Sequence, residues 1–129
     1  MSAAAISIAA YAVYLLGQGA TLLLIPNTIL PILGLPQAAD HWVRIVGMTV
    51  LFFAIYYGLA ARNEWRPFFA TTVATRLSVP VVFAVLVATN QAPAALLLLT
   101  PADIVFSAWT WLALRRLPAA ALQPARSAR

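Results

Sequence analysis

Two side chains of opposite charge, Arg76 and Asp103, each lie near the middle of an apolar run of about 20 residues. A helix of that length crosses the hydrocarbon core of a bilayer. Ionisable groups at that depth cost free energy unless they are paired or hydrated, so they mark a functional site by default. Arg76 could hold a carbonyl, carboxylate or phosphate-like group, and Asp103 is the candidate catalytic acid or base.

The depths of these two residues predict that they meet. With a rise of 1.5 Å per residue, Arg76 lies roughly 13 Å from the start of its helix at Pro67. Asp103 lies roughly 18 Å from Arg115, near the end of its own helix, by the same rise. Because a very short connection joins the two helices, they are expected to be antiparallel neighbours. The sequence therefore predicts an Arg76–Asp103 ion pair inside the protein, since either charge alone would lack compensation.

Further polar residues fall in the same layer and follow helical spacing. On the first apolar run the stripe is Tyr11, Tyr14, Gln18 and Thr21, and on the last it is Thr100, Asp103, Ser107 and Thr110. In lipid such stripes face other helices. One interpretation is a hydrogen-bonded network that only fixes helix register; the other is a ligand pocket. The predicted ligand-binding residues are Arg76, Asp103, Tyr14, Gln18, Ser107, Thr72 and Thr49.

Two prolines bear on the backbone around these charges. Pro80 has no N–H, so the carbonyl of Arg76, four residues earlier, loses its helical partner. The segment Thr100-Pro101-Ala102-Asp103 is typical of a helix start, with Thr100 as the N-cap. One interpretation is a helix broken at mid-membrane, where transporters build binding sites. The other is a proline kink in which Asp103 merely caps the helix.

Composition defines the class of protein. Of 129 residues, 64% are hydrophobic and 9% are charged, with a mean hydropathy of +0.91, whereas a soluble domain has roughly 25% charged residues. The chain has no cysteine and a single histidine, His41, so we predict no metal site and no disulfide. The net charge of +5 does not indicate nucleic acid, because the arginines do not cluster on a soluble face.

The apolar runs predict an all-α fold, an integral membrane bundle of four transmembrane helices in one domain over residues 1–117. A basic, proline-containing tail at residues 118–129 is expected to be disordered and to touch anionic headgroups. The predicted spans are about 3–25, 42–61, 67–89 and 93–117.

The arginines predict the orientation. They lie between the second and third spans and after the fourth, while the other two connections carry none. The positive-inside rule then puts both termini in the cytoplasm, in a multi-pass protein of the cell inner membrane. The arginines concerned are Arg62, Arg66, Arg115, Arg116, Arg126 and Arg129.

The connection after the first span, Pro26–Asp40, combines three prolines with several aliphatic residues. The prolines exclude a long helix, yet so apolar a segment resists full exposure. We expect a short interfacial or re-entrant segment resting on protein. It could simply cover helix ends, or it could gate a ligand cavity.

Three segments resemble small bacterial four-helix membrane proteins of the DoxX-like type. They are Pro26 with Gly34-Leu35-Pro36, the helix entry Trp42-Val43-Arg44-Ile45-Val46-Gly47, and Asp103-Ile104-Val105 followed by Trp109-Thr110-Trp111. The resemblance implies a four-helix bundle and, for some members, association with quinone or redox partners. It supplies no catalytic residue and names no cofactor for this chain.

The residues favour a membrane protein whose core binds a small amphipathic or lipid-like molecule, with Asp103 orienting Arg76. An alternative is an acid/base enzyme acting through Asp103 on an isoprenoid, sterol-like or quinone substrate. A structural or assembly subunit and a dimeric proton- or ion-coupled carrier are further alternatives. The expected partners are the lipid bilayer, a lipophilic small molecule and either a second copy or another membrane protein, but not nucleic acid.

Overall fold

A computed structural model describes residues 1–117 of the chain, and this part is helical with no strands. Four helices are long and apolar enough to cross a membrane, as predicted, and their ends fall within two residues of the expected ones. The predicted tail, residues 118–129, lies outside the described residues. The elements are α1 (Ala3–Leu24), α2 (Pro26–Ile32), α3 (Trp42–Arg62), α4 (Arg66–Ala88), the 3-10 helix η1 (Ala94–Leu99) and α5 (Thr100–Arg115).

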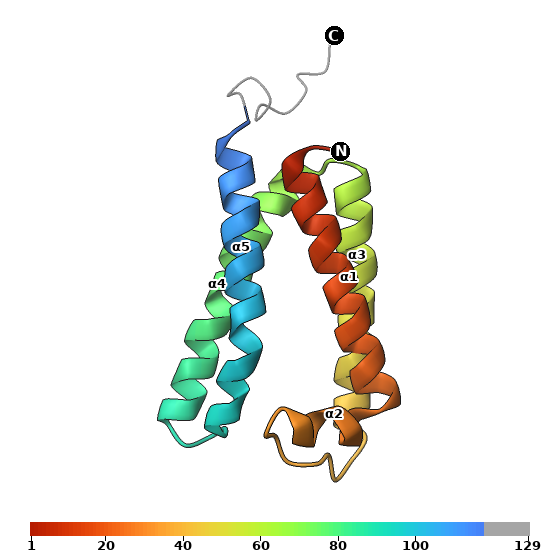
Figure 1. Cartoon of the computed structure of the whole chain (residues 1–129), viewed down its shortest axis with the longest axis vertical. Coiled ribbons are helices and arrows are strands. Elements are labelled where there is room, and N and C mark those ends of the chain that lie inside the picture. Colours follow the sequence, from red (N-terminus) through yellow and green to blue (C-terminus); the bar gives the residue numbers. More distant parts are fainter. Residues whose placement is uncertain (118–129) are drawn as a thin grey trace.

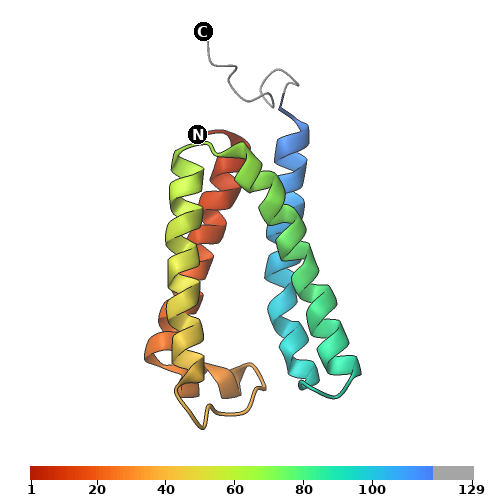
Figure 2. The same cartoon turned by 180° about the vertical axis from the view of Figure 1, so that it is seen from behind.

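The long helices form two hairpins that meet at one end and diverge at the other. Helix α1 packs along α3, and α4 packs along α5 (Figure 1). The hairpins come together at the end that holds the start of α1, the α3–α4 turn and the end of α5, as the opposite view also shows (Figure 2). The backbones of the consecutive helices α3 and α4 hardly approach each other beyond their turn. The bundle is therefore tightly packed at one end only.

Alanines make the tight end. Five alanines, from α1, α3 and α5, are buried there around Ile8 and the fully buried Phe69, in a cluster of Ala4, Ala5, Ile8, Ala60, Ala61, Phe69 and Ala113. Small side chains let helix backbones approach closely, which is how membrane helices associate when lipid offers no hydrophobic drive. The two hairpins are thus joined by close packing at this end.

Two glycines set the contact between α1 and α3 toward the other end. A Cβ atom on Gly47 would lie 2.6 Å from the backbone nitrogen of Leu23 and 2.9 Å from the carbonyl oxygen of Gly19. A Cβ atom on Gly19 would in turn lie 2.9 Å from the Gly47 carbonyl oxygen. The backbones are therefore in contact, and only glycine fits at either position.

The connection after α1 contains the short segment that the prolines predicted. Helix α2 is seven residues long, with Pro26 in its first turn and Pro31 inside it. Its Leu30 is buried while Ile32 is 74% exposed. The chain leaves it at Gly34, whose φ of +74° favours glycine. The exclusion of a long helix is confirmed; the interfacial or re-entrant placement of the segment and its role as a cover or gate stay predictions.

The fourth span changes helix type and is not interrupted. It begins as 3-10 helix η1 and continues as α5 from Thr100. The predicted N-cap role of Thr100 is wrong, because its hydroxyl donates to the carbonyl of Leu97 at 2.8 Å. Asp103 does not cap the helix either, since α5 has no side-chain cap and the Asp103 carboxylate is bonded elsewhere. Pro80 likewise lies within a continuous α4.

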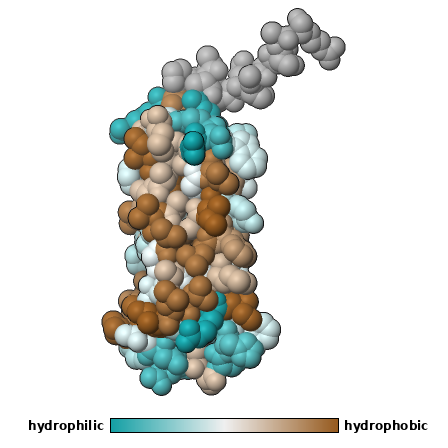
Figure 3. Space-filling view, turned by 90° about the vertical axis from the view of Figure 1, so that its right-hand side faces the viewer, coloured by the Kyte–Doolittle hydropathy of each residue, from teal (hydrophilic) through white to brown (hydrophobic). Residues whose placement is uncertain are grey.

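The outer faces of the long helices are apolar. In space-filling view the middle of the molecule is mainly hydrophobic and both ends are hydrophilic (Figure 3). Large exposed side chains on these faces include Val13, Val81 and Val105. A soluble domain rarely exposes apolar surface so extensively. The four apolar helices indicate a multi-pass membrane protein.

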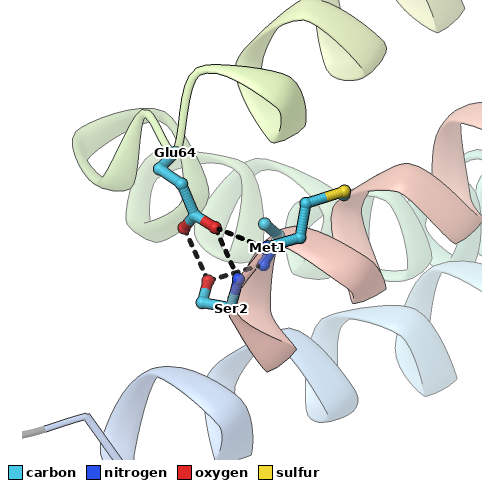
Figure 4. Close-up of polar contacts among 4 residues, drawn as sticks. Met1, Ser2 and Glu64 are labelled. Atoms are coloured by element: carbon cyan, nitrogen blue, oxygen red, sulfur yellow. Dashed lines mark hydrogen bonds and ion pairs between the residues drawn. The ribbon is translucent and has the colours of Figure 1, made fainter.

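Glu64, in the α3–α4 turn, ties that turn to the start of α1 (Figure 4). Its carboxylate accepts hydrogen bonds from the backbone N–H of Ser2 at 2.5 Å and from the Ser2 hydroxyl at 2.6 Å, and lies 3.9 Å from the amino group of Met1. The Ser2 hydroxyl bond, above all, lowers the pKa of the Glu64 carboxyl. Glu64 takes a positive φ of 51° in making this turn. The turn is thus fixed at the tight end of the molecule.

The contact between Gly19 and Gly47 predicts a sharp difference between two glycines of α3. Gly47→Ala should lower the free energy of unfolding by about 1–3 kcal/mol, because a methyl group there meets backbone that cannot move aside. Gly58→Ala is the control, since Gly58 has nothing within 4 Å of the added atom and alanine favours helix. Denaturant titration in detergent micelles measures both. Equal effects of the two substitutions would contradict the glycine contact.

Candidate functional site

Arg76 projects from α4 into the contact between the two hairpins and is only 3% exposed. Its Nε donates to the carbonyl of Thr72 at 3.2 Å, and its Nη2 donates to Thr110 Oγ1 of α5 at 3.1 Å. The ring of Tyr11, from α1, lies under the guanidinium, with 4.4 Å between the ring centroid and the Arg76 Cζ atom. This distance is that of a cation–π contact. The guanidinium is held by groups from three helices.

One guanidinium nitrogen has no partner. Arg76 Nη1 is buried and forms no hydrogen bond within residues 1–117. Nearly all buried donors in proteins are bonded, and an unmet one costs about 1–3 kcal/mol, more when it is charged. This nitrogen is therefore an unmet hydrogen-bond donor in the centre of the site.

Asp103 does not pair directly with Arg76, so the predicted ion pair is corrected. Within the described part of the chain, no Arg76 nitrogen lies within 4.0 Å of an Asp103 carboxylate oxygen. Instead the Tyr11 hydroxyl donates to Asp103 Oδ1 at 2.5 Å. Tyr11 lies between the two charged groups. Its ring contacts the Arg76 guanidinium, and its hydroxyl donates to the Asp103 carboxylate. The depth argument placed both charges in one layer, but it could not foresee a side chain between them.

Aromatic rings surround Tyr11 and fix it. Its centroid lies 5.7 Å from that of Tyr14, 5.2 Å from Tyr57 and 5.3 Å from Phe106. The hydroxyl of Tyr57, on α3, is hydrogen-bonded to that of Thr72. Every long helix thus contributes a ring or a polar group to the cluster around Arg76.

Three residues of this cluster were not among the predicted ligand-binding residues. Tyr11 and Thr110 do belong to the polar stripes of their helices, so helical spacing was a signal for both. Thr110 also contacts Ser7, at 2.9 Å between the hydroxyl oxygens. Tyr57 had no such signal, because an aromatic residue near a helix end is equally typical of a membrane interface.

A cavity of about 960 Å³ adjoins the cluster. It lies mainly between α3 and α4, where these helices diverge, with Tyr11 and Asp103 reaching its wall from α1 and α5. Its size is at the upper end of the range for pockets that hold one small molecule. The lining surface is mostly apolar and aromatic, and the side chains in it that carry a polar atom are Tyr11, Tyr56, Tyr57, Asn63, Trp65, Thr71, Thr72, Thr75, Arg76 and Asp103.

Apart from Arg76 and Asp103, only one of the predicted ligand-binding residues, Thr72, lines this cavity. Thr72 is buried at the cavity wall. Tyr14 supports Tyr11 from α1, and Gln18 is half-buried without lining this cavity. Ser107 is fully buried beside a second cavity, of about 550 Å³, between α4 and α5.

Thr49 does not belong to the site, and its prediction is corrected. It is exposed, and its hydroxyl donates to the carbonyl of Ile45 in its own helix at 3.0 Å. Its depth along α3 was compatible with the site, but its side chain lies on the outer face of the helix. Counting residues gives depth and leaves the direction of a side chain undetermined.

The chain matches no protein-family model, no curated protein and no solved structure. The DoxX-like resemblance accordingly stays a prediction. Residues 1–117 contain no group of three or more histidine, cysteine or acidic side chains that could hold a metal ion. What fold and site define together is a multi-pass helical protein with a buried arginine beside a large apolar cavity.

The bridging role of Tyr11 predicts strong coupling between Tyr11 and Asp103. Tyr11→Phe should cost about 1–3 kcal/mol of unfolding free energy, because it leaves the carboxylate without its donor. The same substitution should cost much less in an Asp103→Leu background, where no carboxylate remains. A double-mutant cycle measured in detergent gives this coupling.

Tyr14→Phe is the matched control for this cycle, since Tyr14 is in the same aromatic cluster but its hydroxyl makes no hydrogen bond within the described residues. Its effect should be the same with and without Asp103. Additive losses for Tyr11→Phe and Asp103→Leu would mean that Tyr11 does not bridge the charges.

Proposed function

We propose that this chain is a multi-pass protein of the cell inner membrane that binds one small amphipathic or lipid-like molecule in the cavity between α3 and α4. The observation that carries the proposal is that Arg76 lines a mostly apolar cavity while its Nη1 is a buried charged donor without a partner. A ligand with a hydrogen-bond acceptor would satisfy this nitrogen. Its apolar remainder would lie among the aromatic and aliphatic lining.

The position of the cavity supports entry from the lipid. Phe53, Tyr56 and Leu59 of α3 line it and are also about half exposed on the outer face of that helix. The backbones of α3 and α4 separate beyond their turn, so the gap between them faces sideways, and the Tyr57–Thr72 hydrogen bond crosses this gap. A molecule dissolved in the bilayer would reach Arg76 without crossing water.

The acid/base enzyme is the second candidate, and one observation favours it. Asp103 lines the same cavity and accepts a hydrogen bond from Tyr11, so a bound isoprenoid, sterol-like or quinone substrate would lie beside a half-buried carboxylate. Binding is common to both candidates and is the property to test first. A structural or assembly subunit would need no ligand in this cavity.

We also propose that the tight end of the molecule is cytoplasmic. Arg62, Arg66, Arg115 and Arg116 all lie at that end, whereas Arg44, at the other end, is bound by its Nη1 to the Leu23 carbonyl that ends α1. An excess of arginine next to membrane helices marks the cytoplasmic side.

Reporter fusions test the orientation. A reporter fused after Arg129 should be active only if it functions in the cytoplasm, because the arginines oppose translocation. A reporter inserted after Gln37, in the connection between α2 and α3, should show the opposite activity and serves as the matched control. A periplasmically active fusion at Arg129 would overturn the orientation.

Ligand binding can be followed by the fluorescence of Trp65, which lines the cavity. A variant that keeps only this tryptophan (Trp42→Phe, Trp109→Phe, Trp111→Phe) is placed in phosphatidylcholine nanodiscs. Dibrominated stearic acid and its methyl ester are the quenching probes, and we expect saturable quenching by at least one of them. Thr75→Phe should weaken that binding at least about tenfold, since it fills the cavity next to Arg76.

Ser78→Phe is the control for Thr75→Phe. Ser78 is exposed on the same helix and, like Thr75, bonds its hydroxyl to a carbonyl of its own helix, but it does not line the cavity. It should leave quenching unchanged. Quenching of Trp65 that is no stronger than that of a variant retaining only Trp42, which lies outside the cavity, would refute the binding function.

A further inference from the structure

We infer that the polar group held by Arg76 is an uncharged hydrogen-bond acceptor, such as an ester or ketone carbonyl, and not an anion. The inference rests on the proposed function and specifies the class of ligand for the same cavity. Three observations support it: the charge balance of the site, the geometry of the free guanidinium nitrogen and the absence of a second cation in the lining.

The charges at the cavity already balance. Arg76 and Asp103 are the two charged side chains among the lining residues. A guanidinium stays protonated in proteins. Asp103 lies near enough to interact electrostatically with Arg76 and accepts the Tyr11 hydrogen bond that suits a carboxylate. The site is therefore neutral as one cation and one anion, each in contact with Tyr11.

Adding an anion would disturb that balance. It would bring a second negative charge close to Asp103 inside a region of low dielectric, where an uncompensated charge is costly. A neutral carbonyl would satisfy Nη1 and leave the net charge at zero. The free donor can thus be completed without burying any new charge.

The geometry of the guanidinium points the same way. Carboxylates and phosphates bind arginine best through two parallel hydrogen bonds from neighbouring nitrogens. Two of the three nitrogens of Arg76 are engaged, Nε with the Thr72 carbonyl and Nη2 with Thr110. The Tyr11 ring also covers one face of the group. The neighbouring nitrogens Nε and Nη2 therefore both donate within the protein already, and the nitrogen without any partner is Nη1, which suits a single acceptor atom.

The rest of the lining offers an anion no second positive charge. Its other polar members are hydroxyls, the side-chain amide of Asn63 and the indole of Trp65. The arginines at the tight end of the molecule do not line the cavity. A charged headgroup bound at Arg76 would have to rely on that one cation, already balanced by Asp103.

The test compares two probes that differ in charge and hardly in shape. In the variant that retains only Trp65, dibrominated methyl stearate should bind at least about tenfold more tightly than dibrominated stearic acid at alkaline pH, where the acid is ionised. The variant that retains only Trp42 reports the concentration of each probe in the lipid. The quenching of Trp65 by a probe is therefore corrected by the quenching of Trp42 by the same probe.

Asp103→Asn tests the cause of the preference. It removes the balancing anion but keeps an oxygen that can accept the Tyr11 hydrogen bond, so the site becomes cationic and the preference should shift toward the acid. The comparison of probes on the chain with native Asp103 stands even if this variant fails to fold.

The outcomes separate the two proposals. If neither probe quenches Trp65 above the reference, the proposed binding function fails. If the ionised acid binds as tightly as the ester or more tightly, binding stands and the neutral-ligand inference is overturned. An ester preference that persists unchanged in a folded Asp103→Asn variant would also overturn it, because charge balance would then not be the cause.

Discussion

The rest of the structure depends on one constraint: the charged guanidinium of Arg76 is buried in an apolar protein. Arg76 cannot shed its proton, so the surrounding helices must supply acceptors, a π face and a countercharge. They do so from different directions: a backbone carbonyl of α4, a hydroxyl of α5, and a tyrosine of α1 that also holds the anion. One nitrogen, Nη1, is left without a partner, and Arg76 also lines the cavity.

Packing decides where the cavity can exist. Alanines bring all four helices together at one end, and a pair of glycines locks α1 to α3 further along. Nothing comparable joins α3 to α4, although they are consecutive, so the hairpins diverge. Arg76 lies where close packing gives way to this divergence. A buried charge and an accessible cavity can be neighbours only at such a boundary, because a fully packed core would leave no cavity.

The site combines features that would each be unremarkable alone. Aromatic clusters commonly stiffen membrane proteins, and threonines commonly bond their own backbone. Here the ring cluster fixes Tyr11, which contacts Arg76 through its ring and Asp103 through its hydroxyl. This arrangement leaves both charges able to act on a third group. A direct ion pair would have consumed the donor that the structure leaves unmet.

The sequence by itself determined the helical class, the ends of the four apolar helices and the layer that contains Arg76 and Asp103. These follow from the length and hydropathy of each run and from a fixed rise per residue, which are local properties of the chain. Only the tertiary structure decided that Tyr11 lies between Arg76 and Asp103, and that Thr110 and Tyr57 belong to the same cluster. It also decided that Thr49 lies on the outer face of α3. The physical reason is that contacts between helices depend on rotation about each helix axis and on crossing geometry. Both are set by where small residues let backbones meet, and neither can be read from depth alone.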